Sequence, residues 1–146
     1  MPGSKTGTVI IVEDDPSMCQ ALKRILRLGE FVPVLYGSAE DLLDDGRKDE
    51  AICMILDVQL PGIDGFALHE RLVALGNVPP VIFITAFDEP EARAKAAKLG
   101  SVFLAKPFSG RVLLETIRSI GRASDQRAPP APGGDTFLTD SSSPKG

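Results

Sequence analysis

The feature that most restricts the fold is a run of six apolar residues at 51–56, which ends at Asp57 and leads into a turn rich in proline and glycine. Because the run does not alternate between apolar and polar residues, we predict a strand buried on both faces, as is typical of parallel sheets. Ligands and chemistry gather at the carboxyl ends of strands in open α/β sheets. Asp57 is therefore either a functional carboxylate or only the cap of the following turn.

Short apolar runs bounded by turn residues predict four more strands, at 8–12, 31–36, 80–85 and 102–106. Apolar residues that recur at intervals of three and four predict helices between them, at 16–28, 38–43, 66–75, 90–99 and after a capping serine, Ser109. Five strands that alternate with five helices predict an α/β fold with a doubly wound, five-stranded parallel sheet.

Three of these helices carry an apolar stripe that we expect to face the core. The stripes are Met18, Ala21, Leu22, Ile25 and Leu28; Leu68, Leu72 and Leu75; and Val112, Leu113, Thr116, Ile117 and Ile120. His69, the only histidine, lies one position off its stripe, so we expect it to face solvent rather than to relay phosphate. Pro33 predicts that the second strand lies at an edge of the sheet, because proline cannot donate to a neighbouring strand.

Composition divides the chain into one domain and two ends. We expect a disordered lead-in at 1–7, a single domain at 8–122, and a disordered tail at 123–146 that is rich in proline, glycine and serine. The only large apolar residues of that tail are Phe137 and Leu138, too few to offset the entropy lost on ordering it.

Charge and cysteine content exclude several classes of function. The net charge is −4 and basic residues form no run longer than two, which argues against direct binding to nucleic acid or to an anionic membrane. Cys19 and Cys53 have neither the number nor the spacing of a disulfide or zinc framework and are expected to be small core residues. We expect a cytoplasmic chain, because it shows no membrane span and no hydrophobic signal region.

Polar residues stand at four of the five predicted strand ends, and only the second strand, which ends near Tyr36, has none. A strand order of 2-1-3-4-5 makes that strand an edge and brings the other four ends together. The residues concerned are Glu13, Asp14, Asp57, Thr85 and Lys106.

The acidic residues of this group predict a cation. Carboxylates about 4 Å apart repel by about 4 kcal/mol per pair at an effective dielectric near 20. Oxygen ligands without histidine or cysteine select a hard cation, and Mg²⁺ takes one or two carboxylates, keeps waters and shares a phosphate. We therefore predict Mg²⁺ near Glu13, Asp14 and Asp57.

Asp57, Thr85 and Lys106 are suited to bind a phosphoryl group. An aspartate carboxylate such as Asp57 is a known nucleophile that forms an aspartyl-phosphate. Lys106 can neutralise a phosphoryl oxygen as a compact positive charge, and the hydroxyl of Thr85 can donate to another.

Four segments resemble the motifs of the response regulator receiver domain of two-component phosphorelays, in the same order: Val-Glu13-Asp14-Asp, Leu-Asp57-Val-Gln-Leu-Pro-Gly-Ile-Asp-Gly, Ile-Thr85-Ala and Lys106-Pro-Phe. The resemblance covers about residues 8–121. It implies a flavodoxin-like receiver that takes a phosphoryl group from a histidine kinase or phosphotransfer protein. Because no output domain follows in this sequence, we expect a stand-alone receiver, unless the chain is a fragment of a longer protein.

The resemblance also implies a role for each matching residue. Asp57 would be the phosphoacceptor, Glu13 and Asp14 would hold Mg²⁺ with Asp57 and the backbone carbonyl of Gln59, and Thr85 and Lys106 would bind the phosphoryl group. The Lys106–Pro107 bond is expected to be cis. Phosphorylation would shift the surface from the fourth strand to the fifth helix, which would bind a downstream protein or a second copy of the chain.

One segment departs from the family pattern. Gly100 to Lys106 is one residue shorter than usual, so the loop before the fifth strand is trimmed. Phe103 matches the aromatic switch position of the family, but it is equally explained as a core residue of the fifth strand.

Three other functions remain open. A receiver-like adaptor would never take phosphate. An aspartate-nucleophile, Mg²⁺-dependent phosphatase of the dehalogenase type would have a second aspartate two residues after the first, where this chain has Gln59. A flavodoxin-like cofactor binder would need a phosphate loop where Glu13, Asp14 and Asp15 stand. The pattern favours a signalling module over an enzyme.

Overall fold

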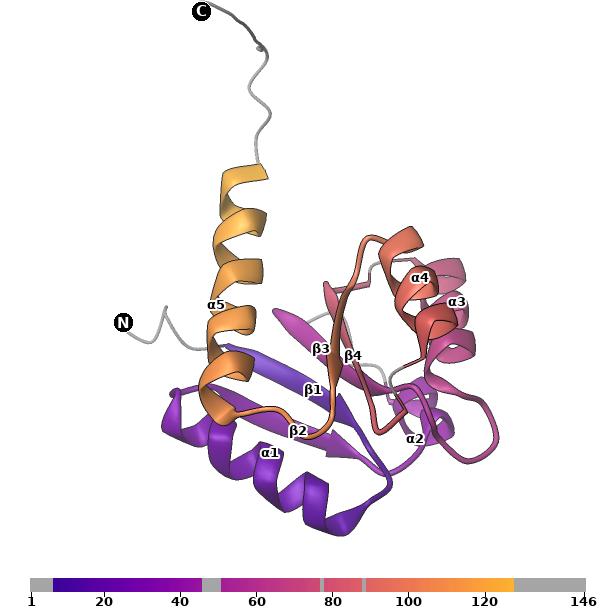
Figure 1. Cartoon of the computed structure of the whole chain (residues 1–146), viewed down its shortest axis with the longest axis horizontal. Coiled ribbons are helices and arrows are strands. Elements are labelled where there is room, and N and C mark those ends of the chain that lie inside the picture. The colour runs from indigo at the N-terminus through magenta and orange to yellow at the C-terminus, as the bar shows by residue number, and fades with distance from the viewer. Residues whose placement is uncertain (1–6, 46–50, 77, 88, 128–146) are drawn as a thin grey trace, which may run out of the picture. The chain divides into compact units, whose positions relative to one another are not determined.

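Five parallel strands form one sheet in the order β2-β1-β3-β4-β5 (Figure 1), which confirms the predicted fold class. The computed structural model describes residues 7–45, 51–76, 78–87 and 89–127, with side chains as far as residue 120. The strands are β1 (Thr8–Val12), β2 (Val32–Tyr36), β3 (Cys53–Asp57), β4 (Val81–Thr85) and β5 (Val102–Ala105). The helices are α1 (Pro16–Leu28), α2 (Ala39–Asp44), α3 (Gly65–Leu75), α4 (Pro90–Lys98) and α5 (Gly110–Arg127).

The chain forms two units, Met1–Glu115 and Thr116–Gly146. The first unit contains the whole sheet, helices α1 to α4 and residues 110–115 of α5. The second unit contains the rest of α5 as far as Arg127. None of the helices in the described part of the chain is both long and apolar enough to cross a membrane.

The sheet is buried at its centre and half-buried at its edges. Every residue of β3 and β4 is buried, whereas β2 and β5 are partly exposed along their length. On one face, Ile10, Met54 and Phe83 belong to a cluster that includes residues of α2, α3 and α4. Successive side chains of a strand point to opposite faces. The alternate residues therefore face the side on which α1 lies (Figure 1).

Local signals set where several elements begin and where β2 lies. The side chains of Ser38 and Ser109 accept hydrogen bonds from the N–H groups of Asp41 and Val112, both at 3.1 Å, and so cap α2 and α5. Pro33 lies in β2, which is an edge strand as predicted. The N–H of Val32 donates to the carbonyl of Gly7 at 2.9 Å, on the β1 side.

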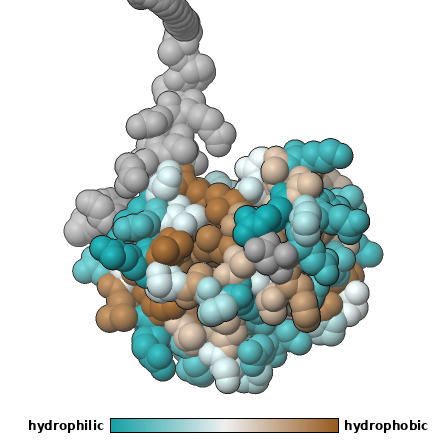
Figure 2. All heavy atoms as spheres, viewed as in Figure 1, coloured by the Kyte–Doolittle hydropathy of each residue, from teal (hydrophilic) through white to brown (hydrophobic). Residues whose placement is uncertain are grey.

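The buried faces of the helices differ from the predicted stripes at their ends. The side chains of Leu28, Leu75 and Val112 are 76%, 67% and 41% exposed (Figure 2 shows apolar groups at the surface). The buried row of α1 runs through Leu22 and Leu26. Leu28 points away from that row, because it lies about 200° around the helix from Leu26.

His69 is buried, so the prediction that it faces solvent is wrong. Its side chain is 8% exposed, and its ring meets that of Phe83 edge-on with centroids 5.6 Å apart. The buried residues of α3 are 65, 66, 68, 69 and 72, so His69 belongs to the buried face rather than flanking it. Burial lowers the pKa of His69, and its Nδ1 has no hydrogen-bond partner within the described residues.

The last helix extends beyond the predicted domain boundary. α5 continues to Arg127, whereas the tail was expected to begin at residue 123. Residues 122–127 contain no proline or glycine, and the first proline after them is Pro129, so nothing in the sequence stops the helix at 122. The expected lead-in at 1–6 and the tail from 128 onward lie outside the described residues.

The two cysteines differ in burial. Cys53 is fully buried in β3, and burial raises the pKa of its thiol to about 12. Cys19 on α1 is only half-buried, and its thiol donates to the carbonyl of Glu13 at 3.2 Å. The prediction of a core residue is thus confirmed for Cys53 alone.

Candidate functional site

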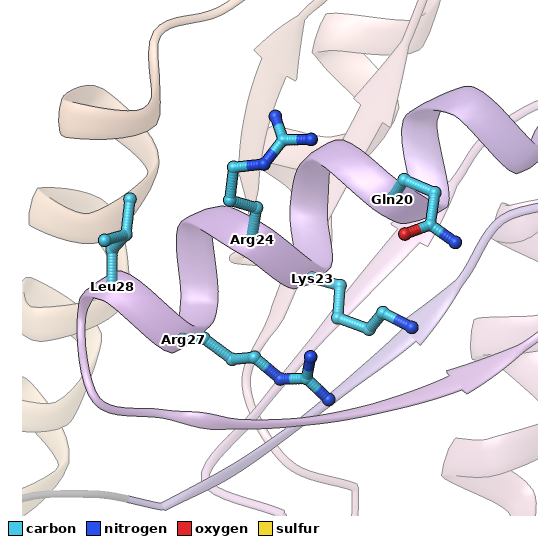
Figure 3. A pocket seen from close by; sticks show the side chains of 5 residues that line it. All are labelled: Gln20, Lys23, Arg24, Arg27 and Leu28. Atoms are coloured by element: carbon cyan, nitrogen blue, oxygen red, sulfur yellow. The ribbon is translucent and has the colours of Figure 1, made fainter.

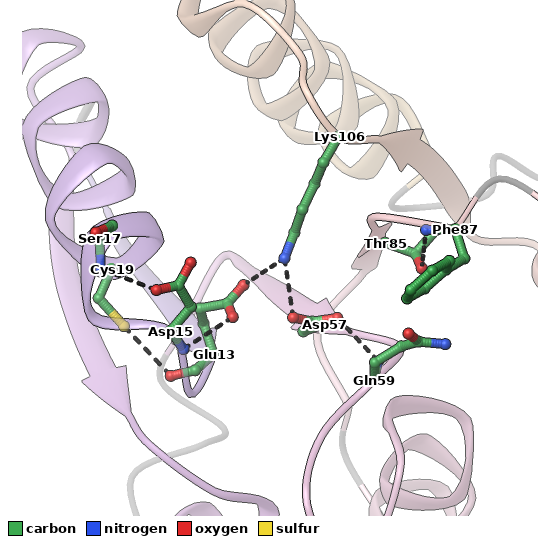
Figure 4. A network of polar contacts seen from close by, with 9 residues as sticks. All are labelled: Glu13, Asp15, Ser17, Cys19, Asp57, Gln59, Thr85, Phe87 and Lys106. Atoms are coloured by element: carbon green, nitrogen blue, oxygen red, sulfur yellow. Dashed lines mark hydrogen bonds and ion pairs between the residues drawn. The ribbon is translucent and has the colours of Figure 1, made fainter.

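Asp57 is the last residue of β3, and both of its carboxylate oxygens have partners (Figure 4). Its Oδ1 accepts a hydrogen bond from the backbone N–H of Gln59 at 2.8 Å, and its Oδ2 lies 3.0 Å from Nζ of Lys106. Asp57 is only 3% exposed. The central strand therefore presents one oriented carboxylate at the carboxyl edge of the sheet.

The strand register brings the other polar strand ends to the same edge. Val12, one residue before Glu13, lies beside Leu56 of β3, and Asp57 lies beside Ile84 of β4. Thr85 lies beside Ala105 of β5, one residue before Lys106. The predicted juxtaposition of four strand ends is therefore present.

Lys106 bridges two buried carboxylates. Its Nζ is 3.0 Å from Oε1 of Glu13 and 3.0 Å from Oδ2 of Asp57. Burial alone would lower the pKa of Lys106, but the hydrogen bonds to Asp57 and Glu13 outweigh it and raise the pKa above its ordinary value. Lys106 is therefore held as a cation. The Lys106–Pro107 peptide is cis, as predicted.

Glu13 is 1% exposed, and its second oxygen, Oε2, accepts the N–H of Asp15 at 3.1 Å. Burial, followed by the neighbouring carboxylate of Asp57, raises the pKa of Glu13 to about 7, although Asp15 and Lys106 partly oppose this rise. Glu13 thus holds a proton at near-neutral pH more readily than an ordinary glutamate.

The three acidic residues suit a hard cation. One carboxylate oxygen each from Glu13, Asp14 and Asp57 lie within 4.8 Å of one another. Asp14 is exposed, so the group opens to solvent on one side. Three oxygen donors with an open side fit Mg²⁺, which keeps waters and shares a phosphate. Lys106 supplies a single positive charge to the group, so a cation would relieve the remaining repulsion.

Thr85 is fully buried at the end of β4, beside the carboxylates but not bonded to Asp57 within the described structure. Its Oγ1 accepts the N–H of Phe87 at 3.0 Å, which leaves the hydroxyl hydrogen available to donate. The carbonyl of Thr85 accepts the N–H of Lys106 at 2.7 Å, and this bond ties the ends of β4 and β5 together.

Gln59 and Phe103 occupy positions compatible with the sequence predictions, but their roles stay predictions. Gln59 is exposed and uses its backbone N–H on Asp57, while its carbonyl remains a predicted metal ligand. Phe103 is half-buried in β5 and packs against the core cluster. The guanidinium of Arg93, on α4, lies 5.0 Å from the centre of its ring.

Two neighbours of the site, Arg93 and Phe87, were not identified from the sequence. Arg93 meets Phe103 only because α4 packs beside β5, and nothing in their spacing indicates this contact. Phe87 is 57% exposed next to Thr85, and the presence of an aromatic residue two positions after a strand-end threonine could have drawn attention to it.

A separate hollow lies on the outer surface of α1 (Figure 3) and is lined by Gln20, Lys23, Arg24, Arg27 and Leu28. Three of these five residues are basic, in a chain whose net charge is −4. The same helix starts at Pro16, directly after the acidic residues of the site. Helix α1 therefore joins an acidic end to a basic surface.

Residues 9–118 match the family model of the response regulator receiver domain. The chain belongs to this family. Receiver domains serve phosphorylation-based two-component signalling, generally as signalling modules rather than enzymes, and typically bind Mg²⁺ at an acidic pocket such as that of Glu13, Asp14 and Asp57.

Individual relatives agree with the family assignment. The receiver is 36% identical over 115 residues to Nodulation protein W of Bradyrhizobium diazoefficiens, covering 78% of this chain and 51% of that protein. It is 35% identical over 126 residues to the transcriptional regulatory protein CreB of Escherichia coli strain K12, covering 86% of this chain and 55% of that protein. The chain thus spans about half the length of these relatives.

A solved structure extends the likeness to three dimensions. A response regulator receiver protein from Burkholderia phymatum superposes with a TM-score of 0.68 at 34% identity, over 80% of this chain and 95% of that one. The fold of this chain therefore agrees with its family assignment.

Proposed function

We propose that this receiver accepts a phosphoryl group on Asp57 from the phosphohistidine of a histidine kinase or phosphotransfer protein. The observation that carries the proposal is the environment of the Asp57 carboxylate. It is oriented by Gln59 and Lys106 and lies within 4.8 Å of the carboxylate oxygens of Glu13 and Asp14. An oriented carboxylate in a site that suits a cation is equipped to act as a nucleophile.

The transfer would replace one bond to phosphorus by another. A carboxylate oxygen of Asp57 bonds to phosphorus while the bond between phosphorus and the donor's imidazole nitrogen breaks. The imidazole keeps the electron pair and takes up a proton from solvent, and the product on this chain is an aspartyl-phosphate. The chain contributes mainly position and charge, as is general for phosphoryl transfer.

Mg²⁺ is the proposed cofactor, held by Glu13, Asp14, Asp57 and the backbone carbonyl of Gln59. When bound, it would spread the negative charge of the transferring group. The fit rests on the oxygen-only donor set and on the open side at Asp14.

Lys106 and Thr85 would stabilise the product. Nζ of Lys106 already contacts Oδ2 of Asp57 and can neutralise a phosphoryl oxygen. The hydroxyl hydrogen of Thr85 is available to donate to another. Drawing Thr85 towards the phosphoryl group would bias the surface from β4 to α5 between two arrangements, with Phe103 as a further switch residue. That surface would bind a downstream protein or a second copy of the chain.

The donor protein would also have to lie against the surface that surrounds Asp57. Helix α1 starts beside Glu13 and Asp14, so a donor that reaches Asp57 can extend along it. The basic hollow of Lys23, Arg24 and Arg27 would then favour a donor with acidic residues at the matching distance.

Replacement of the acceptor tests the proposal directly. Asp57→Asn should abolish labelling by a kinase or by acetyl phosphate, because the amide is not a nucleophile for phosphorus. Asp64→Asn is the matched control: Asp64 is an exposed carboxylate in the same loop and should label at the wild-type rate. Phosphate incorporation into intact chains gives the measurement. Full labelling of Asp57→Asn would place the acceptor elsewhere.

A further inference from the structure

Gly65, the first residue of α3, lies against the backbone that carries Asp57. A Cβ atom built on Gly65 would stand 2.4 Å from the carbonyl oxygen of Asp57 and 3.0 Å from the Cα of Val58. These are main-chain atoms, which cannot rotate away as the end of a flexible side chain can. No residue with a side chain fits here unless β3 or α3 moves.

The backbone on the two sides of Val58 is held by hydrogen bonds to two different elements. The N–H of Val58 donates to the carbonyl of Ile84 on β4 at 2.8 Å. The carbonyl of Val58 accepts the N–H of Gly65 at 3.0 Å. β4 and the first turn of α3 thus hold the backbone next to the acceptor, and Gly65 permits this approach by having no side chain.

Movement of this backbone would reach the carboxylate. The next residue, Gln59, donates its N–H to Oδ1 of Asp57 at 2.8 Å, so the backbone after Asp57 also orients its side chain. A methyl group at residue 65 would require a shift of about 1 Å to reach ordinary contact distance. A misplacement of about 1 Å can cost about 100-fold in rate.

We propose that Gly65 is a positioning residue for phosphoryl transfer, and that its lack of a side chain lets α3 hold the backbone of Asp57 and Val58 in the reactive geometry. This inference rests on the proposed role of Asp57 as acceptor. It assigns Gly65 a role different from that of Gly62 in the same loop, whose φ of 77° explains why glycine is needed there.

Gly65→Ala and Gly62→Ala form a matched pair of variants in the full chain. Both add one methyl group to the same loop. At Gly62 the methyl strains a backbone with a φ of 77° but meets only the carboxylate of Glu40 at 3.1 Å, the end of a flexible side chain, so this variant controls for a loss of stability in the loop. Labelling by acetyl phosphate is measured at saturating Mg²⁺ and at a temperature where circular dichroism shows both variants folded. We expect Gly65→Ala to label about 10- to 100-fold more slowly and Gly62→Ala to stay within about threefold of wild type.

The loss should persist at saturating Mg²⁺, because it comes from the position of the acceptor carboxylate. The Mg²⁺ concentration for half-maximal rate should also rise, because Asp57 and the carbonyl of Gln59 are proposed ligands of the metal. A wild-type rate for folded Gly65→Ala, or an equal loss in Gly62→Ala, would overturn the inference. If Asp57→Asn still labels fully, the proposed function itself fails; if only Gly65→Ala is unaffected, the inference alone fails.

A second pair of variants decides the matter if Gly65→Ala does not fold. The side chain of Asp64 caps α3 by accepting the N–H of Ala67 at 2.8 Å, so Asp64→Ala loosens the first turn without adding atoms. Ser38→Ala removes the equivalent cap of α2. We expect slower labelling, by about threefold or more, in Asp64→Ala alone, and recovery in Asp64→Asn, which keeps the cap. Equal rates in Asp64→Ala and Ser38→Ala would overturn the inference.

Discussion

Lys106 lies between two buried carboxylates and contacts one oxygen of each at 3.0 Å. One cation cannot balance Glu13, Asp57 and the nearby Asp14 together when all three are ionised. The imbalance has two possible remedies, a proton on Glu13 or a metal ion. The raised pKa of Glu13 indicates that, without a metal, the proton provides part of the compensation.

The affinity for Mg²⁺ should therefore depend on pH. With the pKa of Glu13 at about 7, the cation must displace a proton below that pH, so we expect affinity to fall by about tenfold per pH unit below 7. The stability of the metal-free chain should change in the opposite sense. The folded state binds this proton more tightly than the unfolded state, whose glutamates titrate near 4.5, so stability is lost as the pH rises through 7.

Mg²⁺ titrations at pH 6 and pH 8 check this dependence, and Glu13→Gln is the matched variant. The amide cannot titrate, so the variant should bind Mg²⁺ more weakly but with much less change between the two pH values. Equal Mg²⁺ affinity of the wild-type chain at both pH values would contradict the competition between Mg²⁺ and a proton on Glu13.

At the residue scale, the position of a side chain could be predicted from the sequence where that residue stands at the end of a strand. Asp57, Thr85 and Lys106 could be brought together because the carboxyl ends of parallel strands meet at one edge. The contact of Gly65 with Asp57 could not be predicted, because it depends on how closely α3 approaches β3. His69 was misplaced for a related reason: helical spacing permits several buried faces, and packing against Phe83 selects one.

Helix α1 follows two acidic residues and carries basic residues on its surface. Arg24 and Arg27 are exposed in the hollow on its surface, whereas Asp14 and Asp15 precede its first turn. Charges at the rim of an interface act mainly on association rate and on salt dependence. We therefore expect the basic residues to affect transfer from a donor protein but not the chemistry at Asp57.

Reversal of both charges, Arg24→Glu with Arg27→Glu, should slow phosphoryl transfer from the cognate donor protein by about tenfold at low salt, and by less at high salt. Labelling by acetyl phosphate should not change, because this small donor needs no docking surface.

The control for this variant reverses two exposed bases on other helices, Arg71 on α3 and Lys98 on α4. It makes the same change in net charge but leaves α1 intact. An equal effect of the two double variants on transfer would show that net charge, and not the surface of α1, controls association.

At the element scale, helix starts were predictable because they depend on local chemistry, as at Ser38, Ser109 and Pro16. Helix ends and buried faces were less predictable. Leu28 and Leu75 fit an apolar spacing but are the last residues of their helices and remain exposed. Helix α5 extends beyond the predicted end of the domain at residue 122. Composition shows where a segment loses apolar residues, but it does not show where a helix ends.

For the whole molecule, strand order is what makes one site from residues far apart in the chain. β3 lies between β1 and β4, so Asp57 has the acidic residues on one side and Thr85 on the other. That order could be predicted because β2, the strand without a polar end, had to be an edge. The protein that binds this domain could not be predicted from the sequence. The choice of partner depends on surface residues, and the residues at the strand ends do not specify that surface.

A phosphoryl mimic tests whether the site controls a distant surface. Beryllofluoride with Mg²⁺ should slow amide hydrogen exchange around Thr85 and change exchange in α4 and β5, because a ligand at Asp57 draws Thr85 towards it. Light scattering on the same samples reports whether the chain pairs with a second copy.

Asp57→Asn serves as the control for the mimic, since it lacks the carboxylate oxygen to which beryllofluoride binds. Changes confined to the wild-type chain would support the switch. No change in either protein would favour a receiver-like adaptor that does not use phosphate.

Pro33 has a consequence for how the chain behaves in a crowded solution. Val32 directs its N–H towards β1, so the alternation of a strand directs the backbone nitrogen of residue 33 outwards, to the open side of β2. Proline there costs the sheet no bond and removes a donor that an incoming strand would need. The open edge of β2 is therefore a poor template for edge-to-edge aggregation.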